Sequence, residues 1–254
     1  MRPQFLDLPQ RPQKPRTSGL THVLDKGVDP ATARAVLAAG GEFVDIWKIG
    51  WGTAYIDKAL PEKLDLLAAY DVSACLGGTL LELAWLQGRS VECLDWASAL
   101  GCPCVEVSRG IAEMSPAEKH RLIATAAERF IVYAEVGSKR ADAHADPQEW
   151  ADEAAADLAA GAAMIIAEGR ESGTVGIYHP SGEVRRDIID ALVSTVGLGS
   201  VLFEAPRKSQ QAWFVRNLGS NVNLGNVALD EVVAVETLRL GLRADTISVA
   251  HVPA

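Results

Sequence analysis

The sequence predicts a single parallel (β/α)8 barrel, or TIM barrel, with a short N-terminal extension. The chain has 254 residues, the usual length of one such barrel. Eight short apolar runs alternate with eight segments of helical spacing, and no linker interrupts them, which favours one closed barrel over a doubly wound sheet. We expect an arm over residues 1–18 and a catalytic barrel over residues 19–254.

The eight apolar runs are the expected strands, and a polar or charged cluster follows each of them. In a parallel barrel all strand C-termini open on one face, so these clusters would converge on one pocket. His22 falls inside the first run and is a weak signal, since it could face the barrel interior or the helix layer. The runs are Leu20–Leu24, Phe43–Trp47, Val72–Leu76, Val105–Val107, Ile131–Ala134, Met164–Ala167, Val201–Phe203 and Val222–Leu224.

Segments with helical spacing lie between these runs, and several carry signals for a helix start. Asp29-Pro30 gives the segment 31–39 an N-cap and a proline at the first helical position. Ser115 with Glu118 has the spacing of a capping box, and Asp146-Pro147 opens an alanine-rich segment to residue 160. Ser90 is a candidate cap for the segment 90–100. The other expected helices cover residues 61–70, 185–196, 210–218 and 229–242.

Composition excludes several classes of function. The chain is 48% apolar with a net charge of −9, which fits a folded core and argues against binding nucleic acid or anionic membrane over its whole surface. We see no membrane-spanning stretch and no signal peptide, and we expect a cytoplasmic protein. Its four cysteines lack zinc-like spacing and are expected to be reduced and mostly packed. No HExxH, GxSxG, GxxxxGK[ST] or GxGxxG motif is present.

The clusters after the strands combine cations, carboxylates and glycines. Lysine and arginine hold phosphate or carboxylate, and grouped carboxylates suit Mg²⁺, so together they indicate a phosphorylated, carboxylated substrate held through a metal. Each residue alone has a plainer explanation, such as a solvated turn or a surface ion pair, but their shared position favours a site. The cations are Lys26, Lys48, Arg109, Lys139, Arg170 and Lys208. The carboxylates are Asp25, Glu135, Glu168, Glu171 and Glu204.

Several of these blocks together resemble the phosphosulfolactate synthase family, and the resemblance covers residues 14–242. The blocks are KPRTSGLT from Lys14, LDKG from Leu24, KIGWGT from Lys48, GGTL from Gly77, EVG from Glu135, EGRESG from Glu168, EAPRKSQQ from Glu204 and NVNLGN from Asn221. The resemblance implies a (β/α)8 barrel that catalyses Mg²⁺-dependent addition of sulfite to phosphoenolpyruvate. The product would be (2R)-2-phospho-3-sulfolactate, on the route to coenzyme M.

The resemblance also implies roles for individual residues. Sulfite would attack the methylene carbon, an enediolate-like charge would develop on the carboxylate, and Lys139 would protonate C2. Lys26 and Arg170 would assist this chemistry. The expected Mg²⁺ ligands are Glu135, Glu168 and Glu204, with Asp25 as a further candidate. The residues expected to contact the substrates are Lys26, Lys48, Arg109, Arg170, Lys208 and Asn223.

Two departures from the family pattern leave alternatives open. Ser138 stands where a lysine is common, and Arg109 stands where an acidic or small polar residue is expected. An extra arginine at the pocket mouth would suit a different anionic nucleophile. A barrel without turnover, like the plant heat-stress proteins that resemble the family, is the other alternative. We expect association into a homo-oligomer in each case.

Overall fold

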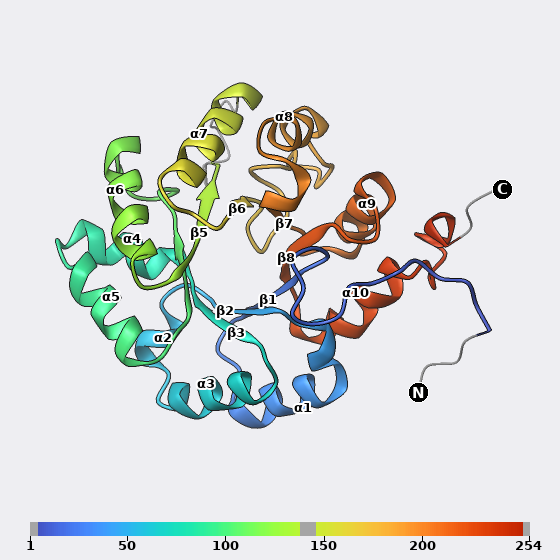
Figure 1. Ribbon diagram of the computed structural model, residues 1–254, viewed down its shortest axis with the longest axis horizontal. Helices are drawn as coiled ribbons and strands as arrows, with labels where there is room; N and C mark the ends of the chain where they lie inside the picture. The colour runs from blue at the N-terminus through green and yellow to red at the C-terminus, as the bar shows by residue number, and fades with distance from the viewer. Residues whose placement is uncertain (1–4, 138–145, 251–254) are drawn as a thin grey trace.

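The computed structural model describes residues 5–137 and 146–250 and has a closed barrel of parallel strands, β1 to β8 in chain order. Strand β8 pairs with β1, which completes the ring, and helices surround the strands (Figure 1). The predicted fold class is confirmed. The strands are β1 (Thr21–Asp25), β2 (Ile46–Ile49), β3 (Ser73–Leu76), β4 (Cys104–Val107), β5 (Ile131–Val136), β6 (Met164–Ala167), β7 (Val201–Glu204) and β8 (Asn223–Val227).

The helices match the expected segments and add two short ones. Asp29, Ser115 and Asp146 are confirmed as N-caps, and Ser115 forms its capping box with Glu118. Ser90 is not a cap, because it is already the first residue of its helix. The unexpected helices, α2 and α4, begin within the polar clusters after β2 and β3. The helices are α1 (Pro30–Gly40), α2 (Thr53–Ile56), α3 (Leu60–Ala69), α4 (Gly78–Leu86), α5 (Ser90–Ala99), α6 (Pro116–Ala127), α7 (Pro147–Ala159), α8 (Arg186–Val196), α9 (Lys208–Leu218) and α10 (Val232–Arg239).

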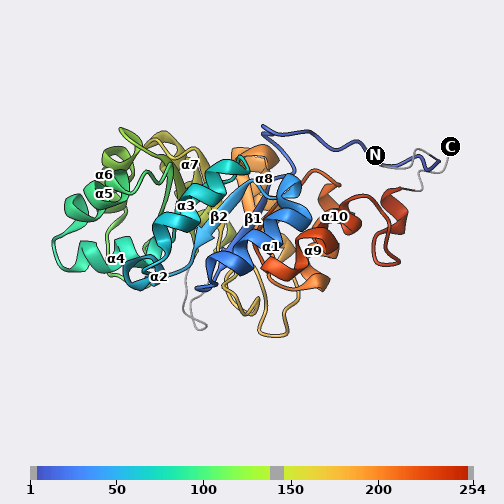
Figure 2. The ribbon, with the colours of Figure 1, turned by 90° about the horizontal axis from the view of Figure 1, so that it is seen from below.

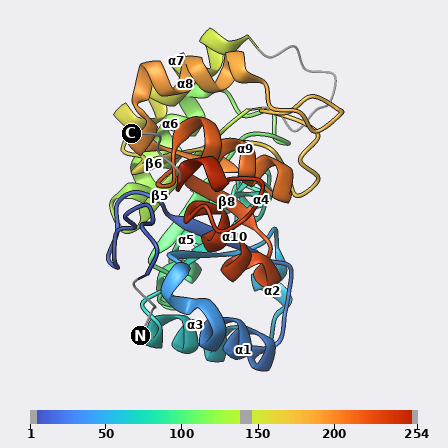
Figure 3. The same cartoon turned by 90° about the vertical axis from the view of Figure 1, so that its right-hand side faces the viewer.

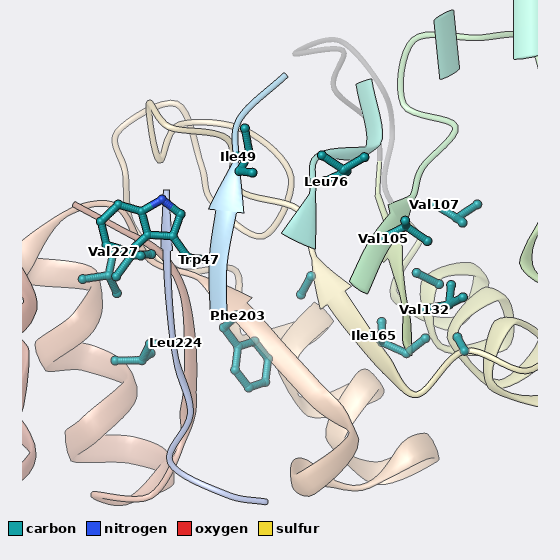
Figure 4. Packing of buried hydrophobic residues seen from close by; sticks show 14 of the residues in the cluster. Trp47, Ile49, Leu76, Val105, Val107, Val132, Ile165, Phe203, Leu224 and Val227 are labelled. Carbon is teal, nitrogen blue, oxygen red and sulfur yellow. The ribbon is translucent and has the colours of Figure 1, made fainter. Parts of the chain in front are cut away.

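Strand residues that face outward form the main hydrophobic core, between the barrel and the helices. Trp47, Phe203 and Val227 are all fully buried in this layer, as Figure 4 shows with other members of the cluster. Phe203 of β7 stacks on Phe214 of α9, with 4.7 Å between ring centroids. Burial of such side chains contributes about 1.5–3 kcal/mol each, so this layer holds the ring of helices on the barrel.

The strand residues that face inward fill the barrel in two layers of opposite chemistry. Because side chains alternate along a strand, the next inward position lies two residues further on. The lower inner layer, nearer the strand N-termini, is an apolar cluster of Leu20, Ile46, Cys75, Cys104, Tyr133, Met164, Ile166 and Leu202. The upper inner layer, nearer the strand C-termini, consists of the polar residues His22, Lys48, Glu106, Glu135, Glu168 and Glu204.

An arm over residues 5–18 packs against the N-terminal end of the barrel. Arg11 donates to Glu236 of α10 at 3.2 Å and to the Gly19 carbonyl at 3.0 Å. Lys14 donates to the carbonyls of Gly41 and Asp71. The arm runs beside α10 when the molecule is seen from the side (Figure 3). Within the described part of the chain, no helix has both the length and the apolar character needed to cross a membrane.

Candidate active site

A cavity of about 190 Å³ opens at the C-terminal ends of the strands. The upper inner layer forms its floor, and the loops after β2, β3, β4 and β6 form its walls. The loop between β6 and α8 projects beyond the strands at this end (Figure 2). Within the described part of the chain, the lining residues are Leu24, Lys48, Trp51, Gly77, Gly78, Thr79, Glu106, Ile111, Glu135, Glu168, Arg170, Glu171, Glu204 and Asn226.

Lys48 of β2 is the central cation of this cavity. Its Nζ lies 2.9 Å from Glu106 Oε2 and 3.3 Å from Glu204 Oε1. Burial alone would lower the pKa of Lys48, but the carboxylates of Glu106, Glu204 and Glu135 outweigh burial and raise the pKa well above its usual value. Lys48 is therefore a fixed positive charge at neutral pH and a poor proton donor.

Glu204 ties Lys48 to the loop that follows β6. Its Oε2 accepts hydrogen bonds from the backbone N–H groups of Gly169 and Arg170, both at 2.9 Å. Arg170 N also donates to Glu168 Oε1 at 2.7 Å. The backbone of Arg170 is thus held between two carboxylates, while its side chain is exposed at the cavity mouth.

Three residues of the cavity wall have left-handed backbone conformations. Trp51, Arg170 and Asn226 have φ angles of 52°, 54° and 51°. Such conformations cost free energy in residues other than glycine and concentrate at functional sites. Asn226 is buried, and its Oδ1 has no hydrogen-bond partner among the described residues. That oxygen is available to a ligand in the cavity.

Glu106 is a cavity residue that the sequence-based prediction missed. It lies in the middle of β4, and its Oε2 also accepts from Gly78 N at 3.1 Å. The pKa of Glu106 is lowered, because Lys48 outweighs the effect of burial. The available signal was a carboxylate two residues after Cys104, at the next inward position of an otherwise apolar strand.

Five residues with a predicted role in catalysis, substrate binding or metal binding meet at the cavity, and Glu171, a further expected carboxylate, lines it with them. Glu135, Glu168 and Glu204 line it with Lys48 and Arg170. Four of the five, all except Arg170, lie on strands or at the residue directly after one.

Arg109, Lys208 and Asn223 do not line the cavity, so the expected contact with substrate is not met for them. Arg109 pairs with Glu153 of α7, with Nη2 2.7 Å from Oε2. Lys208 pairs with Asp245 at 3.0 Å on the outside of the barrel. Asn223 lies at the opposite end of β8, where its Oδ1 accepts from Leu20 N at 3.0 Å and its Nδ2 donates to the Val201 carbonyl at 3.1 Å. Asn226, on the same strand, is the asparagine of the cavity.

The cluster after β1 is also turned away from the cavity. Lys26 lies on an exposed turn and is not part of the cavity lining. Asp25 is buried, where it accepts hydrogen bonds from Gly27 N at 2.7 Å and Trp47 Nε1 at 3.0 Å and pairs with Lys63 at 2.7 Å. Asp25 thus holds β1 against its neighbours. Lys139, the expected proton donor, lies outside the described residues.

The cavity lining is rich in carboxylates, which is relevant to the expected binding of Mg²⁺. Among the described residues, five glutamates face the cavity against two cations, Lys48 and Arg170. An anionic substrate would need a companion cation in these surroundings. No group of three or more acidic, histidine or cysteine side chains in the described chain is arranged to hold a metal alone. The donor set fits Mg²⁺ that is held by one or two carboxylates with substrate and water oxygens. Glu135, Glu168 and Asn226 line the cavity and carry oxygen atoms of this kind.

Comparison with known proteins supports an enzymatic role for this cavity. A family model described as (2R)-phospho-3-sulfolactate synthase (ComA) matches residues 9–245. A phosphosulfolactate synthase of Methanothermobacter thermautotrophicus is 41% identical over 245 residues, which are 94% of this chain and 95% of that protein. The phosphosulfolactate synthase of Bacillus subtilis is 38% identical over 244 residues, covering 95% and 97% of the two chains. That of Methanocaldococcus jannaschii is 42% identical over 236 residues, covering 90% and 93%.

Solved structures share the fold at low sequence identity. The 3-hexulose-6-phosphate synthase of Salmonella typhimurium has a TM-score of 0.57 at 12% identity, covering 91% of this chain and 94% of that one. The 3-keto-L-gulonate-6-phosphate decarboxylase of Vibrio cholerae has a TM-score of 0.53 at 12% identity, covering 87% and 96%. At such identities the likeness extends to the barrel fold.

Proposed function

The chain belongs to the phosphosulfolactate synthase family of lyase-type enzymes, and on that premise we propose that it adds sulfite to phosphoenolpyruvate with the aid of Mg²⁺. The product is (2R)-2-phospho-3-sulfolactate, on the route to coenzyme M, and the enzyme works in the cytoplasm as a homo-oligomer. The observation that carries this proposal is the cavity itself. Its size suits a three-carbon ligand, and Lys48 and Arg170 supply positive charge beside metal-binding carboxylates.

The proposed reaction forms one carbon–sulfur bond and consumes one proton. The sulfite sulfur attacks C3 of phosphoenolpyruvate, the electron pair of the double bond moves toward C2 and the carboxylate, and a proton is then added at C2. A bound Mg²⁺ would supply positive charge beside that carboxylate. Lys48, which stays protonated, stabilises the developing negative charge without giving up its own proton.

Other residues of the cavity bind and orient the substrates in this proposal. Arg170 binds an anionic group at the mouth, and its backbone, held by Glu168 and Glu204, fixes its position. Glu135 and Glu168 would hold the metal. Glu204, the third expected ligand, instead contacts Lys48 and the backbone N–H groups of Gly169 and Arg170. Lys139 remains the predicted proton donor. The alternative of another nucleophile depended on Arg109 at the mouth, and the pairing of Arg109 with Glu153 removes that reason.

Incubation of the purified protein with phosphoenolpyruvate and Mg²⁺, followed by 31P NMR, tests the proposal. Parallel samples contain sulfite, sulfate, bicarbonate or no nucleophile, and a further sulfite sample contains EDTA. We expect loss of the phosphoenolpyruvate resonance and growth of one new phosphate ester resonance with sulfite alone, and no reaction with EDTA. Unchanged phosphoenolpyruvate in the sulfite sample, or equal turnover with EDTA, would contradict the proposal.

A further inference from the structure

His22 of β1 is a fully buried histidine in the upper inner layer, next to the cavity but outside its lining. Neither the predicted site nor the proposed reaction uses it. Its two ring nitrogens face two different parts of the cavity wall. This placement suggests that His22 acts on the cavity through the residues around it.

The Nδ1 atom of His22 faces β8. The backbone N–H of Asn226 donates to Nδ1 at 3.4 Å, so Nδ1 must carry a lone pair. The approach depends on Gly225, because a Cβ there would lie 3.3 Å from Nδ1 and 2.2 Å from Leu202 Cδ2. This contact uses Nδ1 as the acceptor and leaves Nε2 as the donor of the ring. It also supports the left-handed backbone of Asn226 at the cavity wall.

The Nε2 atom of His22 faces β4. It lies 3.3 Å from Glu106 Oε1, and neither atom forms a well-aligned hydrogen bond with any other described residue. Both atoms are fully buried, and buried polar atoms are nearly always satisfied. A small adjustment that lets Nε2–H donate to Oε1 satisfies both at once. The other oxygen of Glu106 already holds Lys48 at 2.9 Å.

We propose that His22 is a positioning residue for the reaction assigned above, on which this inference rests. As a donor through Nε2, it orients Glu106 and directs the other oxygen of Glu106 toward Lys48. As an acceptor, it fixes Asn226 on the opposite wall. The buried ring of His22 therefore sets the distance between Lys48 Nζ and Asn226 Oδ1 in the cavity.

Two substitutions separate the two contacts. The amide nitrogen of Gln reaches the position of Nε2, so His22→Gln keeps a donor to Glu106. The amide oxygen of Asn takes the position of Nδ1, so His22→Asn keeps only the acceptor for Asn226. We expect kcat/KM for phosphoenolpyruvate to fall about 10- to 100-fold in His22→Asn and much less in His22→Gln. His120→Asn, on α6 outside the cavity, is the matched control. Equal kinetics for the two His22 variants would overturn the proposal.

The ring protonation of His22 gives a readout that does not depend on turnover. Nitrogen-15 NMR of the wild-type protein, with the His22 resonance assigned from the spectrum of His22→Gln, should show a neutral ring protonated at Nε2 at neutral pH. A proton on Nδ1, or on both nitrogens, would overturn the proposal. Wild-type turnover is measured in the same series. Absence of that turnover would contradict the proposed function, while the tautomer would still decide the role of His22.

Discussion

The two inner layers of the barrel share the same strands and differ completely in chemistry. The lower inner layer is apolar, with residues such as Met164 and Leu202, and makes a sealed core. The upper inner layer, one inward position further along, carries Lys48 and four glutamates around a cavity. The comparison shows that two inward positions only two residues apart on a strand can differ in role. The first packs in the apolar core, and the second lines the cavity or supports its lining. We expect substitutions in the upper inner layer to reduce activity and those in the lower inner layer to reduce stability.

The largest effect on activity is expected for Lys48→Met. This change removes the central cation and leaves Glu106 and Glu204 without it, so kcat/KM should fall by about 10²- to 10³-fold. The 31P NMR assay measures the loss, and circular dichroism confirms folding. Lys208→Ala is the matched control, because Lys208 is partly exposed and pairs only with Asp245 among the described residues. It should change kcat/KM by less than about threefold. A folded Lys48→Met enzyme with near wild-type kcat/KM would contradict the division between the layers.

A substitution in the lower inner layer should reduce stability and leave kcat/KM nearly unchanged. Leu202→Ala leaves a cavity in a fully buried apolar position, which should reduce the free energy of unfolding by about 2–5 kcal/mol. The enzyme that remains folded should keep a kcat/KM close to that of the wild type. Urea denaturation and the same activity assay measure the two quantities. A large loss of kcat/KM with unchanged stability would show that the lower inner layer has a catalytic role.

The smallest expected effect is a pH dependence of stability that only the upper inner layer shows. The pKa of Glu106 is lowered in the folded protein, because Lys48 outweighs burial. The unfolded state therefore binds the proton at higher pH, and the stability contributed by Glu106 is lost as pH falls below the usual glutamate range toward the folded pKa. Urea denaturation between pH 7 and 4 should show a shallower acid loss in Glu106→Gln than in the wild type. Parallel pH profiles for the two proteins would contradict this.

The sequence predicted the barrel well, because hydrophobic runs, caps and chain length all depend on local pattern. Asp29, Ser115 and Asp146 cap helices as expected. The site was predicted less well, because polar residues after the strands were treated alike. Lys48 and Glu204 lie within strands and point inward, whereas Lys26 and Lys208 lie in the following segments and point outward.

The residues that were missed depend on alternation within the strands and on pairing between them. Glu106 and His22 reach the cavity region because each occupies an inward position of its strand. Their contact across the barrel, between β4 and β1, follows from the three-dimensional structure and not from the sequence pattern. Asn226 takes the place of Asn223 because it lies near the C-terminal end of β8, where the cavity opens, whereas Asn223 is the first residue of the strand.

Arg11 and Glu236, which form a hydrogen bond, are 225 positions apart in the chain. Strand β1 likewise has β8, the last strand of the chain, as one of its two neighbours in the barrel. Any sheet that the early strands form during synthesis therefore has an unpaired edge at β1 until residue 227 has left the ribosome. Such bare edges can pair with other chains. Production of this protein should therefore be sensitive to translation rate and to chaperone supply, although the finished ring offers no free edge.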